Sequence, residues 1–346
     1  MSVLDVERLI DDRIAAIRKF HADAQVKRAE LDLSGGIDSA VMAGLLVLAL
    51  GPDNVTLAHT KINTSHEQSR RARDLAIALD CRLAVGHFSG AYNVIIAELL
   101  RSLDAAGYDE DEIEQRIKDD PTILGSIRST LRAPLGRAYN RLTGGGIRHG
   151  TGNECEDRFL RFYQKGGDGE VDTNPLAMLS KTEVYQLAFG LARRFNDAVI
   201  AAFTATINAV PSPDLWGFTN HSDEAELFSL TGVPFTYGRI DALTGKIMSF
   251  GTIERVARFL DTYFAGWPVS HILFGSNKMS LALVAAAKES GYFDDYTHLE
   301  IEAFLSAANR IERLTRHKMN SNCPALGDRA WLVTAGILTN DLILEN

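Results

Sequence analysis

The chain has 346 residues, of which 46% are hydrophobic and 23% are charged. This composition suits a soluble α/β protein with a sizeable core. Its formal net charge is −9, so an extended surface for nucleic acid is not expected. Three scattered cysteines exclude a disulfide framework and a cysteine-rich zinc site. No signal peptide and no apolar run long enough to cross a bilayer is apparent, so we expect a cytoplasmic protein without a membrane partner.

Strand and helix patterns alternate over the first hundred residues. Apolar residues at helical spacing predict a leading helix over 3–20. Strands are expected at 29–33, 55–60 and 82–88, and helices at 40–50, 65–79 and 91–103. This alternation predicts an α/β fold with a doubly wound parallel sheet flanked by helices. Ligands of such sheets bind at the carboxyl ends of the strands.

The second half of the chain is less regular. Residues 105–121 are acidic and rich in turn formers, so we expect an irregular, mobile surface segment there. A helix is expected over 123–142, with Pro134 either kinking it or beginning a new helix. A helix over 181–195 has a capping box of Ser180 and Glu183. Residues 244–295 are read as helices of mixed pattern.

The stretch Leu31–Ala40 carries the strongest chemical signal. It reads as a strand, a Ser-Gly-Gly turn and the start of an apolar helix. Two glycines let the backbone approach a ligand closely, and the free N–H groups of a helix start attract an anion. Ser34 and Ser39 add hydroxyl donors, and Asp38 adds a carboxylate for a cation. We interpret the turn as a pyrophosphate cradle that lacks the lysine of a P-loop.

Four clusters downstream combine glycine, carboxylates and lysine. They span residues 150–156, 165–172, 175–183 and 211–227. Alone, each is usually a turn or a surface bend. Within the first cluster, a carboxylate facing Asp38 would complete an oxygen-lined Mg²⁺ site on ATP phosphates.

In this order the motifs resemble those of the ammonia-dependent NAD synthetases, which belong to the N-type ATP pyrophosphatases with the PP-loop. The matching pieces are Ser34-Gly35-Gly36-Ile37-Asp38-Ser39, Gly150-Thr151-Gly152-Asn153 with Glu156, Gly167-Asp168-Gly169 with Asp172, Asn174-Pro175 with Lys181-Thr182, Pro211-Ser212 with Asp214-Leu215-Trp216, Asp223-Glu224 with Glu226-Leu227, and His317-Lys318. The resemblance covers residues 5–330 with interruptions and implies an adenine nucleotide alpha hydrolase-like fold.

The resemblance also implies roles for single residues. Asp38 and Glu156 would bind Mg²⁺, and Asp38 and Lys181 would be catalytic. The expected ATP contacts are Ser34, Gly35, Gly36, Ile37, Asp38, Ser39, Thr151, Lys181 and Ser212. The expected contacts to deamido-NAD are Arg132, Lys165, Asp172, His317 and Lys318.

The implied reaction is an ATP-dependent amidation. The nicotinate carboxylate of deamido-NAD would attack the α-phosphate of ATP, and ammonia would attack the resulting acyl-adenylate, releasing AMP. No amidohydrolase domain is seen before the cradle, so we expect free ammonia or a separate donor rather than glutamine hydrolysis within this chain. A homodimer is implied as well.

The sequence departs from the family pattern at three places. Residues 144–149, before the Gly-Thr-Gly turn, are more polar than the usual buried strand. Thr130 stands where the first of two arginines is usual, so Arg128 or Arg132 would have to substitute. A long stretch, 242–298, is inserted before the final His-Lys pair. We therefore expect a single domain over 1–346 with a helical insertion at 242–298.

Two other interpretations of the sequence remain open. One is another N-type ATP pyrophosphatase, such as a GMP synthetase core or a tRNA-modifying adenylating enzyme. The latter would need a strongly basic surface or added cysteines, and the acidic chain has neither. The other is a nucleotide-binding relative that has lost turnover.

Overall fold

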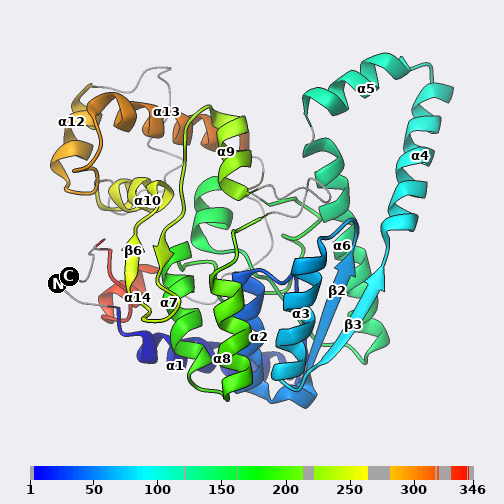
Figure 1. Ribbon diagram of the computed structural model, residues 1–346, viewed down its shortest axis with the longest axis horizontal. Helices are drawn as coiled ribbons and strands as arrows, with labels where there is room; N and C mark the ends of the chain where they lie inside the picture. The colour runs from blue at the N-terminus through cyan, green and yellow to red at the C-terminus, as the bar shows by residue number, and fades with distance from the viewer. Residues whose placement is uncertain are drawn as a thin grey trace.

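A parallel sheet of four strands forms the centre of the structure, a computed structural model (Figure 1). The strands are β1 (Ala29–Asp32), β2 (Val55–Lys61), β3 (Arg82–His87) and β4 (Ile147–His149), in the order β3-β2-β1-β4. In register, Leu31 of β1 pairs with Leu57 of β2 and with His149 of β4. The structure describes residues 4–120, 122–161, 163–212, 222–263, 281–315, 318, 329–340 and 342. The predicted parallel α/β sheet is confirmed.

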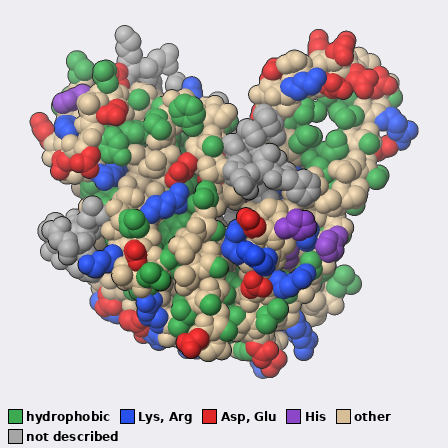
Figure 2. All heavy atoms as spheres, viewed as in Figure 1, with side chains coloured by type: hydrophobic (Ala, Val, Ile, Leu, Met, Phe, Trp, Pro, Cys, Tyr) green, Lys and Arg blue, Asp and Glu red, His purple; other side chains and the backbone are tan. Residues whose placement is uncertain are grey.

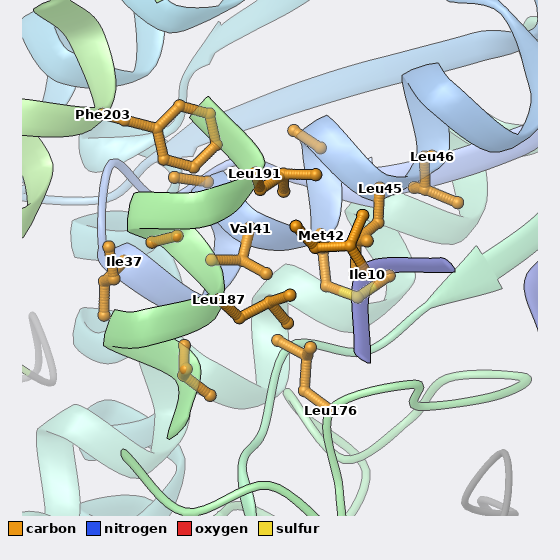
Figure 3. Packing of buried hydrophobic residues seen from close by; sticks show 14 of the residues in the cluster. Ile10, Ile37, Val41, Met42, Leu45, Leu46, Leu176, Leu187, Leu191 and Phe203 are labelled. Atoms are coloured by element: carbon orange, nitrogen blue, oxygen red, sulfur yellow. The ribbon is translucent and has the colours of Figure 1, made fainter. Parts of the chain in front are cut away.

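One face of the sheet carries the main hydrophobic core. Helix α2 (Ile37–Leu50) packs between this face and the helices α1 (Val6–Ala24), α7 (Lys181–Ala192) and α8 (Asp197–Ile207). Figure 3 shows Met42 and Leu45 of α2 among side chains of α1 and α7. Helix α2 is apolar on nearly all sides, as its buried position requires. The helices α3 (His66–Ala78) and α4 (Ser89–Ala105) confirm the remaining predicted strand–helix units.

The opposite face of the sheet carries buried charges beneath α6 (Thr122–Leu142). Arg148 of β4 pairs with Glu30 at 2.7 Å and with Asp32, both on β1. Alternation along a strand places these side chains opposite to Leu31, which faces the main core. Helix α6 passes Pro134 without a break, so of the two expectations for Pro134, a new helix is wrong.

The expectation of an irregular segment over 105–121 is wrong in part. Helix α5 (Glu110–Asp119) forms there, with Asp109 as N-cap and acidic residues in the first turn. The ion pairs Arg116–Glu112 and Lys118–Glu114 join positions four residues apart. A helix with no buried residue needs such pairs and caps, and the charges that suggested a turn supply them.

A second hydrophobic cluster lies beside the first. It is formed by η2 (Glu154–Leu160), α9 (Asp223–Thr231), α10 (Thr252–Tyr263), α12 (Leu281–Glu289) and α13 (His298–Thr315). The stretch 242–298 therefore contributes α10 and α12 to a core, as expected of helices. The prediction that 242–298 is helical is wrong at the start of that stretch. Strand β6 (Ile247–Ser249) lies there and pairs antiparallel with β5 (Arg239–Ile240).

The last described helix is α14 (Arg329–Thr334), and its Leu332 packs in the main core. Across the part of the chain that the structure describes, no helix is long and apolar enough to cross a membrane.

Candidate active site

The loop between β1 and α2 is shaped by its own hydroxyl groups. The Ser34 hydroxyl accepts a hydrogen bond from the Gly36 amide at 3.1 Å, and the Ser39 hydroxyl donates to the Gly36 carbonyl at 3.0 Å. Gly35 has φ +86°, and a Cβ there would lie 2.2 Å from the Gln68 carbonyl oxygen. Only glycine fits that position. The loop therefore leaves the amino end of α2, with its free N–H groups, at the carboxyl end of β1.

This loop borders a cavity of about 470 Å³. The cavity lies at the carboxyl ends of the strands, where ligands of doubly wound sheets bind. The residues expected at the site that line it are Ser34, Gly36, Ile37, Asp38, Arg132, Thr151, Glu156, Lys181, Ser212 and Lys318.

Lys181 joins the two carboxylates expected to bind a metal ion. Its Nζ donates to Asp38 Oδ2 and to Glu156 Oε1, each at 2.7 Å. The amide of Asn153 donates to the other oxygen of Asp38 at 3.0 Å. Burial by itself would lower the pKa of Lys181, but the charges of Asp38 and Glu156 outweigh it and raise the pKa well above its ordinary value. Lys181 is therefore a permanent cation in the cavity.

The position of Lys181 is fixed from two sides. Ser180 and Glu183 form the predicted capping box at the start of α7, which sets where Lys181 begins the helix. Glu254 of α10 accepts hydrogen bonds from the amide and the hydroxyl of Thr182, each at 2.6 Å. Helix α10, within the stretch 242–298, thus positions Lys181.

Glu156 lies on the π-helix η2, a rare geometry that is often found at functional sites. Its neighbour Glu154 is buried and pairs with Arg258 of α10, and Arg329 of α14 lies 3.7 Å away. Burial would raise the pKa of Glu154, but the arginines outweigh it and lower the pKa to about 2. Glu154 is thus an ionised anchor for η2, and through η2 for Glu156.

The carboxylates of Asp38 and Glu156 converge on one point, the Lys181 ammonium group. Two hard oxygen ligands on one cation suit Mg²⁺, which commonly uses one or two carboxylates together with phosphates. Among the described residues, no three His, Cys, Asp or Glu side chains are grouped closely enough to hold a metal ion by themselves. The donor set therefore fits a metal ion that arrives with nucleotide phosphates.

The remaining expected residues lie at different distances from this centre. Gly35 and Ser39 belong to the loop but do not line the cavity, and Lys165 is exposed outside it. Asp172 pairs with Arg137 at 2.9 Å and accepts a hydrogen bond from the Arg148 amide. His317 and residues 213–221 lie outside the described residues.

Lys318 lines the cavity and is held by two backbone carbonyls. Its ammonium group donates to the carbonyls of Arg161 at 3.0 Å and Tyr163 at 2.6 Å. Of the two arginines proposed to replace the family arginine at Thr130, Arg132 lines the cavity, whereas Arg128 is buried away from it.

Sequence reasoning missed several residues that line the cavity. Arg71 of α3 lines it and donates to the Gly35 carbonyl at 2.9 Å. Nothing in its local sequence marks it, because it reaches the loop from a different strand–helix unit. Gln68, Arg161, Tyr163, Tyr185 and Arg310 are among the others that line it.

Residues 9–251 match the family model described as NAD synthase. The chain belongs to the NAD synthase family. It is therefore a ligase, and members of this family use ATP as a substrate. A similar relative is the NH(3)-dependent NAD(+) synthetase of Halobacterium salinarum, 32% identical over 282 residues, which are 80% of this chain and 91% of the relative. That of Methanosarcina acetivorans is 32% identical over 227 residues, 65% of this chain and 78% of the relative.

Solved structures support the fold of this NAD synthase family member. An NMN synthetase from Francisella tularensis has a TM-score of 0.59 at 20% identity, covering 91% of this chain and 96% of that one. A glutamine-dependent NAD(+) synthetase from Cytophaga hutchinsonii has a TM-score of 0.62 at 14% identity, covering 92% of this chain and 50% of that one. The expected family and fold are confirmed.

Proposed function

We propose that this enzyme converts deamido-NAD to NAD with ATP and ammonia, releasing AMP and pyrophosphate. The observation that carries the proposal is the convergence of Asp38, Glu156 and Lys181 beside an anion-binding loop. This arrangement supplies fixed positive charge and metal ligands where a triphosphate would lie, within a chain of the NAD synthase family.

The first step activates the carboxylate. A nicotinate carboxylate oxygen attacks the α-phosphorus of ATP, the bond from that phosphorus to the bridging oxygen breaks, and pyrophosphate leaves. Negative charge grows on the phosphate oxygens, so the loop amides and Lys181 stabilise the transition state. Thr151 and Ser212, which line the cavity, would contact ATP.

Asp38 and Glu156 would hold Mg²⁺ brought by the nucleotide. The bound ion would neutralise charge on the phosphates. Lys181 would orient both carboxylates before the nucleotide arrives.

The second step forms the amide. Ammonia attacks the acyl carbon, the bond to the AMP oxygen breaks, and AMP leaves with that electron pair. Arg132 and Lys318 line the cavity and would contact the acceptor. Lys165, Asp172 and His317 stay proposed acceptor contacts from the family pattern alone.

We also propose that the chain forms one domain and works as a cytoplasmic homodimer. Helices α4 and α5 project as an arm (Figure 1), and hydrophobic side chains gather on its inner side (Figure 2). Val94 and Leu99 of α4 are exposed, which suits burial against a second copy. Light scattering should give the mass of a dimer, and a monomer at working concentration would refute this.

The proposed reaction is tested by measuring which acceptor supports the release of AMP and pyrophosphate. Release of AMP and pyrophosphate should require ammonium and deamido-NAD together. Xanthosine monophosphate supporting the release instead would indicate a GMP synthetase activity. Binding of ATP without turnover on either acceptor would contradict a catalytic role.

A further inference from the structure

Helix α3 brings a cation to the loop between β1 and α2 that the mechanism above does not use. Arg71 Nε donates to the Gly35 carbonyl at 2.9 Å. The same side chain lines the cavity together with Ser34 and Asp38. Within the described part of the chain, its guanidinium group makes no other hydrogen bond and pairs with no carboxylate. Arginine has five N–H donors, so its two terminal nitrogens are left for a ligand.

The guanidinium group is held in place by the way α3 packs on this loop. A Cβ on Gly35 would lie 2.2 Å from the Gln68 carbonyl oxygen, so the backbones of the loop and the helix touch. The ring of His59 on β2 joins the end of β1 to the helix a second time. Its Nδ1 donates to the Leu33 carbonyl at 2.7 Å, and its Nε2 lies 3.1 Å from Ser69 Oγ. The cation therefore sits on a helix that is fixed relative to the loop.

The cluster around Lys181 alone offers no net positive charge to a triphosphate. Lys181 Nζ is bonded to Asp38 and Glu156, each at 2.7 Å, and two carboxylates outweigh one ammonium group. A P-loop supplies a lysine to the phosphates, and the loop between β1 and α2 contains none. Arg71 brings a positive charge to this loop without a carboxylate bonded to it.

Two other cations of the cavity lining are attached elsewhere. Arg310 of α13 donates to the Leu230 carbonyl on α9 at 2.6 Å. Lys318 donates to the Tyr163 carbonyl at 2.6 Å. Arg71, in contrast, is bonded to the backbone of the loop itself, so it is placed where the loop amides would hold phosphate.

We propose that Arg71 contacts the β- and γ-phosphates of ATP and stabilises the pyrophosphate as it leaves. The inference rests on the proposed function, which makes ATP the substrate at this loop. When the acceptor's carboxylate oxygen bonds to the α-phosphorus, the bond from that phosphorus to the bridging oxygen breaks, and its electron pair goes to pyrophosphate. A planar guanidinium group can bind two phosphate oxygens at once, and its attraction for them grows with that charge.

Two substitutions separate contact with phosphate from support of the loop. Arg71→Gln keeps an N–H donor for the Gly35 carbonyl but removes the charge, whereas Arg71→Lys keeps the charge. Arg70→Gln is the control, because Arg70 is the neighbouring arginine on α3 but is exposed and does not line the cavity. The measurements are calorimetric titrations with magnesium pyrophosphate and with AMP, and a thermal melt of each variant.

We expect the Kd for pyrophosphate to rise about tenfold or more in Arg71→Gln, because a charge-assisted hydrogen bond is lost. Arg71→Lys should recover most of the affinity, and Arg70→Gln should match wild type. AMP binding should stay unchanged in all variants, because AMP lacks the leaving phosphates. An unchanged Kd for pyrophosphate in Arg71→Gln would overturn the proposal. An equal loss in Arg71→Gln and Arg71→Lys would also overturn it, because the role of Arg71 would then be support of the loop.

A second measurement needs no variant. In wild-type crystals soaked with magnesium pyrophosphate, a terminal nitrogen of Arg71 should lie about 3 Å from a phosphate oxygen. Pyrophosphate bound out of reach of Arg71, or absent from the loop, would refute the contact.

Failure of this contact and failure of the proposed function give different results. Enzyme that binds pyrophosphate through Arg71 but does not amidate deamido-NAD would refute the proposed function and leave the phosphate contact. Enzyme that amidates deamido-NAD, with unchanged pyrophosphate binding in Arg71→Gln, would refute the contact alone.

Discussion

Lys181 and its two carboxylates depend on one another at the scale of single residues. Each is buried enough that loss of one partner leaves another without its counter-charge. Breaking one member of such a group usually costs more than the group contributes as a whole. Substitutions here must therefore be read with a stability measurement beside the activity.

Asp38→Asn should reduce ammonium-dependent turnover about a hundredfold or more, because it removes charge from both the metal site and Lys181. Asparagine keeps the side-chain shape, so we expect the fold to remain intact. Steady-state kinetics and a thermal melt on the same sample test this. Activity retained in a folded variant would remove Asp38 from the metal site.

Two stacked histidines predict a pH-dependent stability. His21 Nε2 of α1 lies 3.0 Å from His149 Nε2 of β4. Burial, and then the charge of His21, lowers the pKa of His149 to about 3. The folded state therefore binds fewer protons than the unfolded state below pH 6.5. The stability that neutral His149 gives is complete above that pH and is lost as the pH falls toward 3.

Urea denaturation measures this effect. Between pH 6 and pH 4 the free energy of unfolding should fall by up to about 1.4 kcal/mol per pH unit for one such group. His149→Gln should flatten that slope. An equal slope in the variant would assign the acid sensitivity to other groups.

At the scale of elements, α6 and β4 fit together through a glycine. A Cβ on Gly136 would lie 1.8 Å from the Arg148 guanidinium, which Glu30 and Asp32 hold in place. The ion pairs of Arg148 with Glu30 and Asp32 explain how β4 can carry an arginine although the strand is buried. Its arginine is neutralised by carboxylates on β1 rather than by solvent.

Gly136→Ala should therefore destabilise the protein by about 2–4 kcal/mol, since it pushes Arg148 off its partners. Gly90→Ala is the control, because Gly90 is also helical but has open space around it. That change should stabilise α4 by up to about 1 kcal/mol. Chemical denaturation of both variants compares the signs, and equal effects would contradict the packing argument.

The strands and most helices could be predicted because their signals are local. The strand–helix alternation and the capping box at Ser180 gave β1–β3 and the start of α7 within a few residues. Helix α5 was missed because its stability comes from charge pairs that resemble a solvated turn. The π-helix η2 was missed because its geometry depends on distant arginines that hold Glu154.

At the scale of the whole molecule, the two hydrophobic clusters meet at the site. Main-core helices α2 and α7 supply Asp38 and Lys181, and η2 of the second cluster supplies Glu156. Glu254 of α10 joins the two by bonding the start of α7. The stretch 242–298, read from the sequence only as an insertion, is thus part of what holds the site.

The site residues that belong to sequence motifs could be predicted. The properties that depend on burial in the folded chain could not. Motif order pointed to Asp38, Glu156 and Lys181, which the structure brings together. It said nothing of how Asp223 is buried at the cavity or how Arg71 reaches the loop from α3. Those properties arise only when helices far apart in the sequence pack together.

The whole account depends on direct attack of the acceptor's carboxylate oxygen on the α-phosphorus of ATP. Oxygen labelling tests this attack, because the attacking oxygen stays with AMP when the amide forms. Deamido-NAD carrying ¹⁸O in its nicotinate carboxylate is turned over with ATP and ammonium, and the products are analysed by mass spectrometry. The account predicts one labelled oxygen in the AMP and none in the pyrophosphate. Unlabelled AMP, or label in the pyrophosphate, would contradict it.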